Sequence, residues 1–138
     1  MFHNKFIRIL ISKEKIIFLA LMLVLVLASS ASMYNKSVAW DEKCYIGQGL
    51  YLFNTGNFKT DGFIYHGALS YYLNSLFLIP LNIKTDAWSK DNCWDIGNDI
   101  IFHSNYNHKT IVFLSRLPFV FIAVLLGFYV FKWAKELY

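Results

Sequence analysis

Two long runs of apolar residues dominate the pattern of hydrophobic and polar positions along the chain. The first run, residues 16–33, has no charged residue, and the second, residues 111–131, has a single one, Arg116. About 20 apolar residues in helical conformation cross the roughly 30 Å hydrocarbon core of a bilayer. The pattern therefore predicts an all-α membrane fold with two transmembrane helices joined by a long loop, residues 34–110.

The loop between the two runs is not composed like an unfolded linker, because it is rich in Tyr, Phe, Leu and Ile. We expect Asp41 to cap a helix over about 42–55 that ends at Gly56. A second helix is expected over about 67–79, apolar almost all round, so it would lie in the membrane interface or pack under other membrane helices. The more polar remainder predicts a short helix near 95–102.

Charge and composition place these elements relative to a membrane. The chain is 57% hydrophobic and 16% charged, which is more apolar than a typical soluble domain. Its formal charge of +4 forms no basic stripe, so nucleic acid is excluded as a partner. Basic residues gather in segments 1–15 and 132–138, while charges between the runs nearly cancel. The positive-inside rule then predicts that both termini are cytoplasmic and that the loop is extracytoplasmic.

Two local features each allow two interpretations. Residues 1–31 also fit a secretory signal peptide, with a basic start, an apolar core and the small residues 29–31 as a cleavage site. Cys44 and Cys93 both fall in the loop. An oxidising compartment permits a disulfide between them, and two unpaired thiols are an equally good interpretation.

Asp41 and Glu42 are adjacent acids at the outer end of the first run. In the simplest interpretation they cap a helix and favour the positive end of its dipole. Arg116, near the outer end of the second run, has a similarly simple interpretation as a headgroup anchor. His66, a lone imidazole, could be an interface residue bonded to backbone. The wider order of motifs favours a more specific interpretation.

Four segments carry a resemblance to a known family. They are Trp40-Asp41-Glu42 followed by Tyr45, the expected helix end from Leu52 to Phe58, the segment from Tyr65-His66 to Asn74, and Ser115-Arg116-Leu117-Pro118. In this order they resemble the multi-pass glycosyltransferases that use polyprenyl-phosphate sugars, including protein O-mannosyltransferases and aminoarabinose transferases. Gly67-Ala68 replaces the two prolines typical of that family. Because its members are several times longer, the chain looks like the amino-terminal part of a larger multi-pass bundle, inactive without the missing C-terminal helices or a complementary chain.

The resemblance implies an inverting transfer of a sugar from a polyprenyl-phosphate donor to a hydroxyl of a protein or lipid acceptor. Asp41 would be the general base, with Glu42 and Tyr45 orienting the acceptor or supporting Asp41. The implied phosphate-binding residues are His66, Arg116 and Lys43. No metal ligand set is predicted in this segment, and the lipid-linked sugar is the only cosubstrate implied.

The expected location is an integral membrane position, in the plasma membrane of a prokaryote rather than the endoplasmic reticulum, with membrane lipid as a partner. The alternative function is a non-catalytic small membrane protein or subunit whose aromatic loop, residues 34–110, binds a partner.

Overall fold

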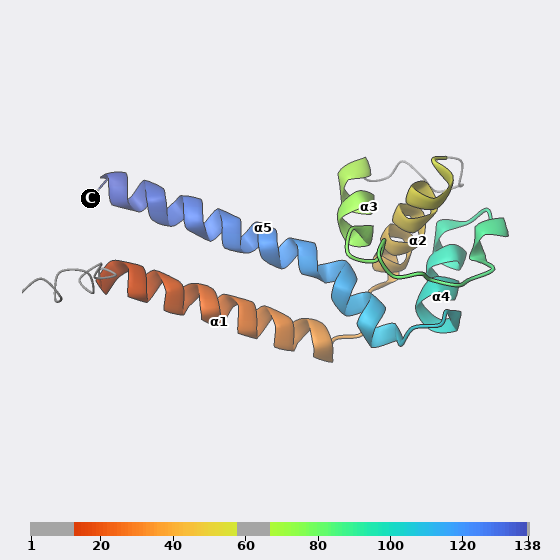
Figure 1. Ribbon diagram of the computed structural model, residues 1–138, viewed down its shortest axis with the longest axis horizontal. Coiled ribbons are helices and arrows are strands. Elements are labelled where there is room, and N and C mark those ends of the chain that lie inside the picture. Colours follow the sequence, from red (N-terminus) through yellow and green to blue (C-terminus); the bar gives the residue numbers. More distant parts are fainter. Residues whose placement is uncertain (1–12, 58–66, 138) are drawn as a thin grey trace, which may run out of the picture.

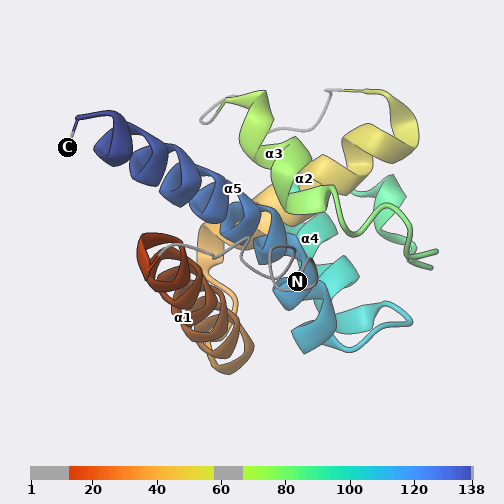
Figure 2. The same cartoon turned by 60° about the vertical axis from the view of Figure 1, so that its left-hand side comes forward.

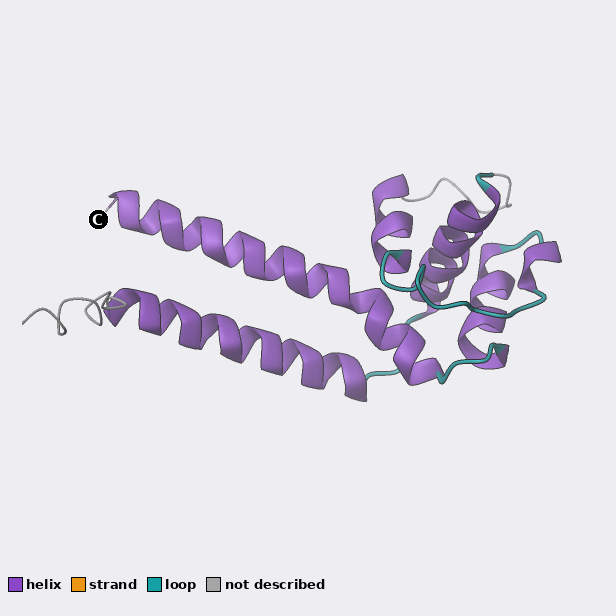
Figure 3. Cartoon of the chain, in the orientation of Figure 1, coloured by secondary structure: helices purple, strands orange, loops and turns teal. Residues whose placement is uncertain are grey.

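The structure is a computed structural model that describes residues 13–57 and 67–137. All regular elements in these two ranges are helices, as Figure 3 shows. The prediction of an all-helical fold is therefore confirmed for this part of the chain. In order, the elements are α1 (Lys13–Asn35), α2 (Trp40–Thr55), α3 (Ala68–Ser75), the short 3-10 helix η1 (Ala87–Ser89), α4 (Cys93–His103) and α5 (His108–Leu137).

Helices α1 and α5 run side by side in opposite directions (Figure 1), and both are long and apolar enough to cross a membrane. Phe18 of α1 stacks on Phe131 of α5 at 4.5 Å between ring centroids. The missing side chain of Gly127 makes room for Met22. No residue of α1 is buried, so most of its apolar surface faces away from the rest of the protein. Such a surface is stable in contact with lipid or with further helices.

Helices α2, α3 and α4 gather at the end of the pair where α1 finishes and α5 begins (Figures 1 and 2). Two glycines of α2 allow both neighbours to approach closely. A side chain on Gly47 would overlap the backbone of Gly97 in α4, and a side chain on Gly49 would overlap Ser75 and the backbone of Tyr71 in α3. Helix α2 therefore packs backbone to backbone against α3 on one side and α4 on another.

The hydrophobic core lies in this helical head and not between the two long helices. It is built from α2, α4, the segment that contains η1 and the first turns of α5. Ile46, Ile100 and Ile111 are completely inaccessible to solvent. The other buried members are Leu50, Leu78, Ala87, Ile96, Ile101 and Val112. The first turns of α5 are thus part of the head, while the rest of that helix lies along α1.

Covalent and polar contacts fasten α4 to its surroundings. Cys44 and Cys93 form a disulfide that joins the first turns of α2 and α4, so the disulfide alternative is correct in this structure. Asp99 of α4 accepts a hydrogen bond from Thr85 and pairs with Lys90, at 2.9 Å and 3.1 Å. Burial raises the pKa of Asp99, but the Thr85 and Lys90 contacts outweigh this, and the pKa lies below its ordinary value. These contacts hold the η1 segment on α4.

Two expected boundaries need correction. Helix α2 is capped by Ala39, so the expectation that Asp41 is the cap was wrong, and Asp41 lies inside the first turn. Its other end is as expected, because Gly56 is left-handed at φ 67° and donates to the Leu52 carbonyl. Helix α3 ends at Ser75, short of residue 79, and turns follow as far as Pro80. The side chain of Ser75 faces α2, where its hydroxyl donates to Ile46.

Candidate functional site

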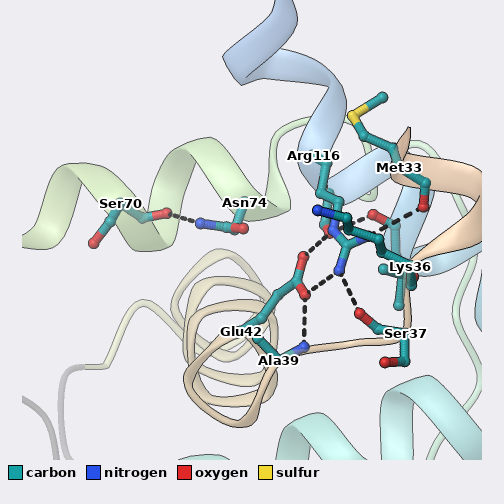
Figure 4. Close-up of polar contacts among 10 residues, drawn as sticks. Met33, Lys36, Ser37, Ala39, Glu42, Ser70, Asn74 and Arg116 are labelled. Atoms are coloured by element: carbon teal, nitrogen blue, oxygen red, sulfur yellow. Dashed lines mark hydrogen bonds and ion pairs between the residues drawn. The ribbon is translucent and has the colours of Figure 1, made fainter. Parts of the chain in front are cut away.

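The candidate site is built around Arg116, whose guanidinium is held by the first turn of α2 and the linker before it (Figure 4). Nε and Nη2 each donate to one carboxylate oxygen of Glu42 at 2.6 Å. The other donors reach the carbonyl oxygens of Met33, Lys36 and Ser37 at 2.9 to 3.2 Å. An arginine has five N–H donors, and all five have acceptors here. The guanidinium therefore has no donor left for a phosphate.

Sequence and local structure explain how this contact forms. Ser115 and Arg116 lie two turns into α5, just before Pro118, whose missing N–H weakens the helix at this point. Figure 1 shows that α5 changes direction between its first turns and the rest. Glu42 is at the third position of α2, where its carboxylate also accepts from the Ala39 N–H at 3.1 Å. The Glu42 carboxylate therefore accepts a hydrogen bond from the capping residue of α2 and also binds Arg116.

Asp41 lies next to Glu42 but faces a different environment. It is exposed in the first turn of α2, and no hydrogen bond or ion pair engages it within residues 13–57 and 67–137. An accessible carboxylate can accept a proton from a bound hydroxyl if the substrate is held within hydrogen-bond reach.

Lys43 and Tyr45 are turned toward neighbouring helices. The Lys43 ammonium lies between two aromatic rings, 5.5 Å from the Trp40 centroid and 5.3 Å from the Phe102 centroid. It also donates to the Asn98 side chain of α4 at 3.2 Å. Both rings are open to solvent, Trp40 at 70% exposure and Phe102 at 47%. An ammonium group has three N–H donors, and Asn98 accepts from one of them.

Tyr45 packs on Tyr71 of α3, with 5.6 Å between ring centroids. Burial raises the pKa of Tyr71, and the neighbouring Tyr45 raises it further. The Tyr71 phenol therefore remains neutral at physiological pH and supplies no charge to the site. The contact between the two rings instead packs α2 on α3 one turn after Asp41, on the same side of α2 as Asp41.

The predicted site residues therefore divide into three groups. Asp41, Glu42, Lys43 and Tyr45 share the start of α2, and Arg116 joins them through Glu42 although 74 positions separate the two. Cys44 and Cys93 form the disulfide that joins α2 to α4. His66, the third implied phosphate ligand, lies outside the described residues. In the part of the chain that the structure describes, no three His, Cys, Asp or Glu side chains come together as a metal site.

Sequence reasoning missed the Glu42–Arg116 pair and the three backbone acceptors. A usable signal was present, since an arginine inside an apolar run needs a partner and Glu42 follows the end of the other apolar run. The carbonyl acceptors left no signal, because any residue supplies a carbonyl. Comparisons with known proteins add no relative: no family model, curated protein or solved structure matches the chain.

Proposed function

We propose that the chain is the amino-terminal part of an inverting glycosyltransferase that moves a sugar from a polyprenyl-phosphate donor to a hydroxyl acceptor at the outer membrane face. The observation that carries this proposal is the placement of Asp41. Its carboxylate is exposed, unpaired within the described residues and located where two long apolar helices end. A donor held by the membrane and an acceptor from the aqueous side would meet at this level.

The proposed chemistry requires one proton acceptor. The acceptor hydroxyl attacks the anomeric carbon as its proton passes to Asp41, and the bond to the lipid phosphate breaks. A phosphate leaves as an anion, so no general acid is needed, and one displacement inverts the configuration at the anomeric carbon. General-base assistance of this kind contributes about 10²- to 10⁴-fold to a rate.

The geometry supports a different division of roles from the one that the resemblance implies. Glu42 is bound by Arg116, so we assign to both a positioning role: they hold the turn that presents Asp41. The donor phosphate would be bound by Lys43, whose ammonium has N–H donors besides the one that Asn98 accepts, together with His66. Tyr45 supports α2 through Tyr71. Membrane helices beyond this chain would complete the donor site, because two helices and a small head cannot enclose a lipid.

The test is Asp41→Asn in the native protein in its own membrane, assayed by transfer of labelled sugar from a polyprenyl-phosphate donor. We expect transfer to fall at least about 100-fold while the protein level in the membrane stays the same. Asp95→Asn is the matched control, because Asp95 is also an exposed acid in the first turn of a helix. Equal transfer by the wild type and Asp41→Asn would exclude Asp41 as the base.

A second candidate function is a non-catalytic membrane subunit, and the exposed aromatic edge of the head favours it. Trp40 and Leu69 have 70% and 69% of their surface exposed, on α2 and α3. Tryptophan is enriched among the residues that carry most of the binding energy of protein interfaces. The two candidates separate in one experiment, since Trp40→Ala would release a copurifying partner from such a subunit, whereas Asp41→Asn would leave that partner bound.

A further inference from the structure

A cavity of about 310 Å³ lies where α1 ends, α5 begins and the linker to α2 crosses between them. Its walls come from the last turn of α1, the linker 36–38, Phe102 of α4 and the first turns of α5. If α1 and α5 cross a membrane, both reach its surface at this level, so the cavity opens in the layer of lipid headgroups. Arg116 fixes one wall of the cavity, because its guanidinium donates hydrogen bonds to the carbonyl groups of Met33 and Lys36.

The side chains around this cavity give it a positive charge. Lys36, His108 and Lys109 contribute to the walls, and the described residues that line the cavity include no acid. All three are exposed. The Lys109 ammonium lies 5.1 Å from the ring centroid of Tyr34, which is also a wall residue. Glu42, whose carboxylate accepts from the Ala39 N–H just after the linker, is paired with Arg116.

Neither the expected membrane topology nor anion binding by a helix N-terminus accounts for the positions of Lys36 and Lys109. The positive-inside rule accounts for basic residues at the cytoplasmic ends of membrane helices, whereas Lys36 and Lys109 are at the opposite ends. The first backbone N–H groups of α5 are also occupied, because those of Lys109, Thr110 and Ile111 donate to Asn107. An anion in the cavity would therefore be bound by side-chain ammonium groups.

We propose that this cavity binds the phosphate of an anionic membrane phospholipid between Lys36 and Lys109, with His108 at its rim. Val112, Phe102 and Tyr34 supply the apolar wall that the glycerol region of such a lipid needs. The bound lipid would link the end of α1 to the start of α5 and so brace the linker that leads to Asp41. The proposal rests on the membrane placement of α1 and α5 and is independent of the transferase assignment.

The test is native mass spectrometry of the full chain in detergent, with phosphatidylglycerol or phosphatidylcholine added. We expect wild type to retain phosphatidylglycerol in preference, and the double variant Lys36→Gln, Lys109→Gln to lose at least about tenfold in that retention. We expect a loss of this size because each lysine near an anionic lipid surface contributes about a fivefold gain in affinity. The variant Lys36→Arg, Lys109→Arg should restore retention.

The matched control is Lys13→Gln, Lys15→Gln, which removes the same charge at the other end of α1, where neither lysine lines the cavity; lipid held in the cavity should stay within about twofold of wild type. Equal retention of both lipids by wild type, or an equal loss in the two double glutamine variants, would overturn the proposal. A further arm adds millimolar inorganic phosphate. Displacement of the lipid by free phosphate would show a soluble-anion site and overturn the lipid assignment, whereas continued retention supports it.

Discussion

At the scale of single residues, the pair formed by Glu42 and Arg116 is the most constrained polar contact of the described chain. Its two side chains have 12% and 18% of their surface exposed, and the contact is bidentate. Removing one partner from a largely buried pair leaves a charge without compensation, which costs about 3–5 kcal/mol. Replacing both partners by apolar groups costs much less. The pair is therefore coupled, and this coupling can be measured.

We predict that Glu42→Gln lowers the free energy of unfolding by about 3 kcal/mol in the wild type but by less than about 1 kcal/mol in an Arg116→Met background. Thermal unfolding in detergent, followed by circular dichroism, measures both. Glu136→Gln serves as the control, because Glu136 is 64% exposed and its 4.0 Å pair with Lys132 is a surface pair. An equal cost of Glu42→Gln in the two backgrounds would show that the contact does not stabilise the fold.

At the scale of elements, the head depends on the close approach of α2 and α4. Gly47 and Gly97 face each other, and a side chain on Gly97 would overlap the carbonyl group of Lys43. The disulfide from Cys44 to Cys93 lies one turn away on the same pair of helices and closes a loop of 49 positions. In the chain-entropy model, a loop of this length contributes about 4 kcal/mol. The glycine contact and the disulfide therefore both hold α2 against α4.

Gly97→Ala should lower the midpoint of thermal unfolding, because the overlapping atom is backbone and cannot rotate away. We expect a loss of about 1–3 kcal/mol, the usual cost of overpacking. Gly67→Ala is the control, since a side chain there meets no atom within 4 Å and Gly67 has an ordinary φ of −58°. Equal stability of both variants would mean that α2 and α4 are farther apart than in this structure.

At the scale of the whole molecule, the fold separates into a compact head and a pair of long helices. The head contains the hydrophobic core, whereas α1 buries none of its residues. The helix pair is joined by ring stacking of Phe18 and by the 3.6 Å contact of Glu14 with Lys135 at the far end. An exposed apolar surface of this extent is typical of contact with lipid or with further helices. We expect the head to lie on one side of the membrane and both termini on the other.

A pair of single-cysteine additions tests this topology. Lys84→Cys adds an exposed thiol to the head, and Lys135→Cys adds one near the end of α5, while the native disulfide stays intact. In intact cells a membrane-impermeant maleimide should label the first variant, and it should label the second after permeabilisation alone. The opposite result would place Asp41 in the cytoplasm and remove the basis of the transferase proposal. Both variants retain Cys44 and Cys93, which serve as an internal measure of oxidation.

Much of the helix pattern could be predicted because helices depend on local sequence. The two apolar runs indicate α1 and α5, and Gly56 indicates the end of α2 through its left-handed conformation. Errors arose where tertiary contacts compete with local preference. Asp41 is a good cap by type, yet Ala39 holds that position because Glu42 bonds back to its N–H. Ser75 ends α3 while it faces Ile46 of α2.

The sequence by itself determined that the chain is helical, that two helices are apolar enough to span a membrane and that two adjacent acids follow the first of them, since composition and periodicity carry this information. The tertiary structure decided which of the adjacent acids is free. Glu42 is taken by Arg116, across 74 positions, and Asp41 is left exposed. It also joined Cys44 to Cys93. Both outcomes depend on how close distant segments come in space. The packing of backbone at the glycines of α2 and α4 sets this distance, and no local sequence pattern records it.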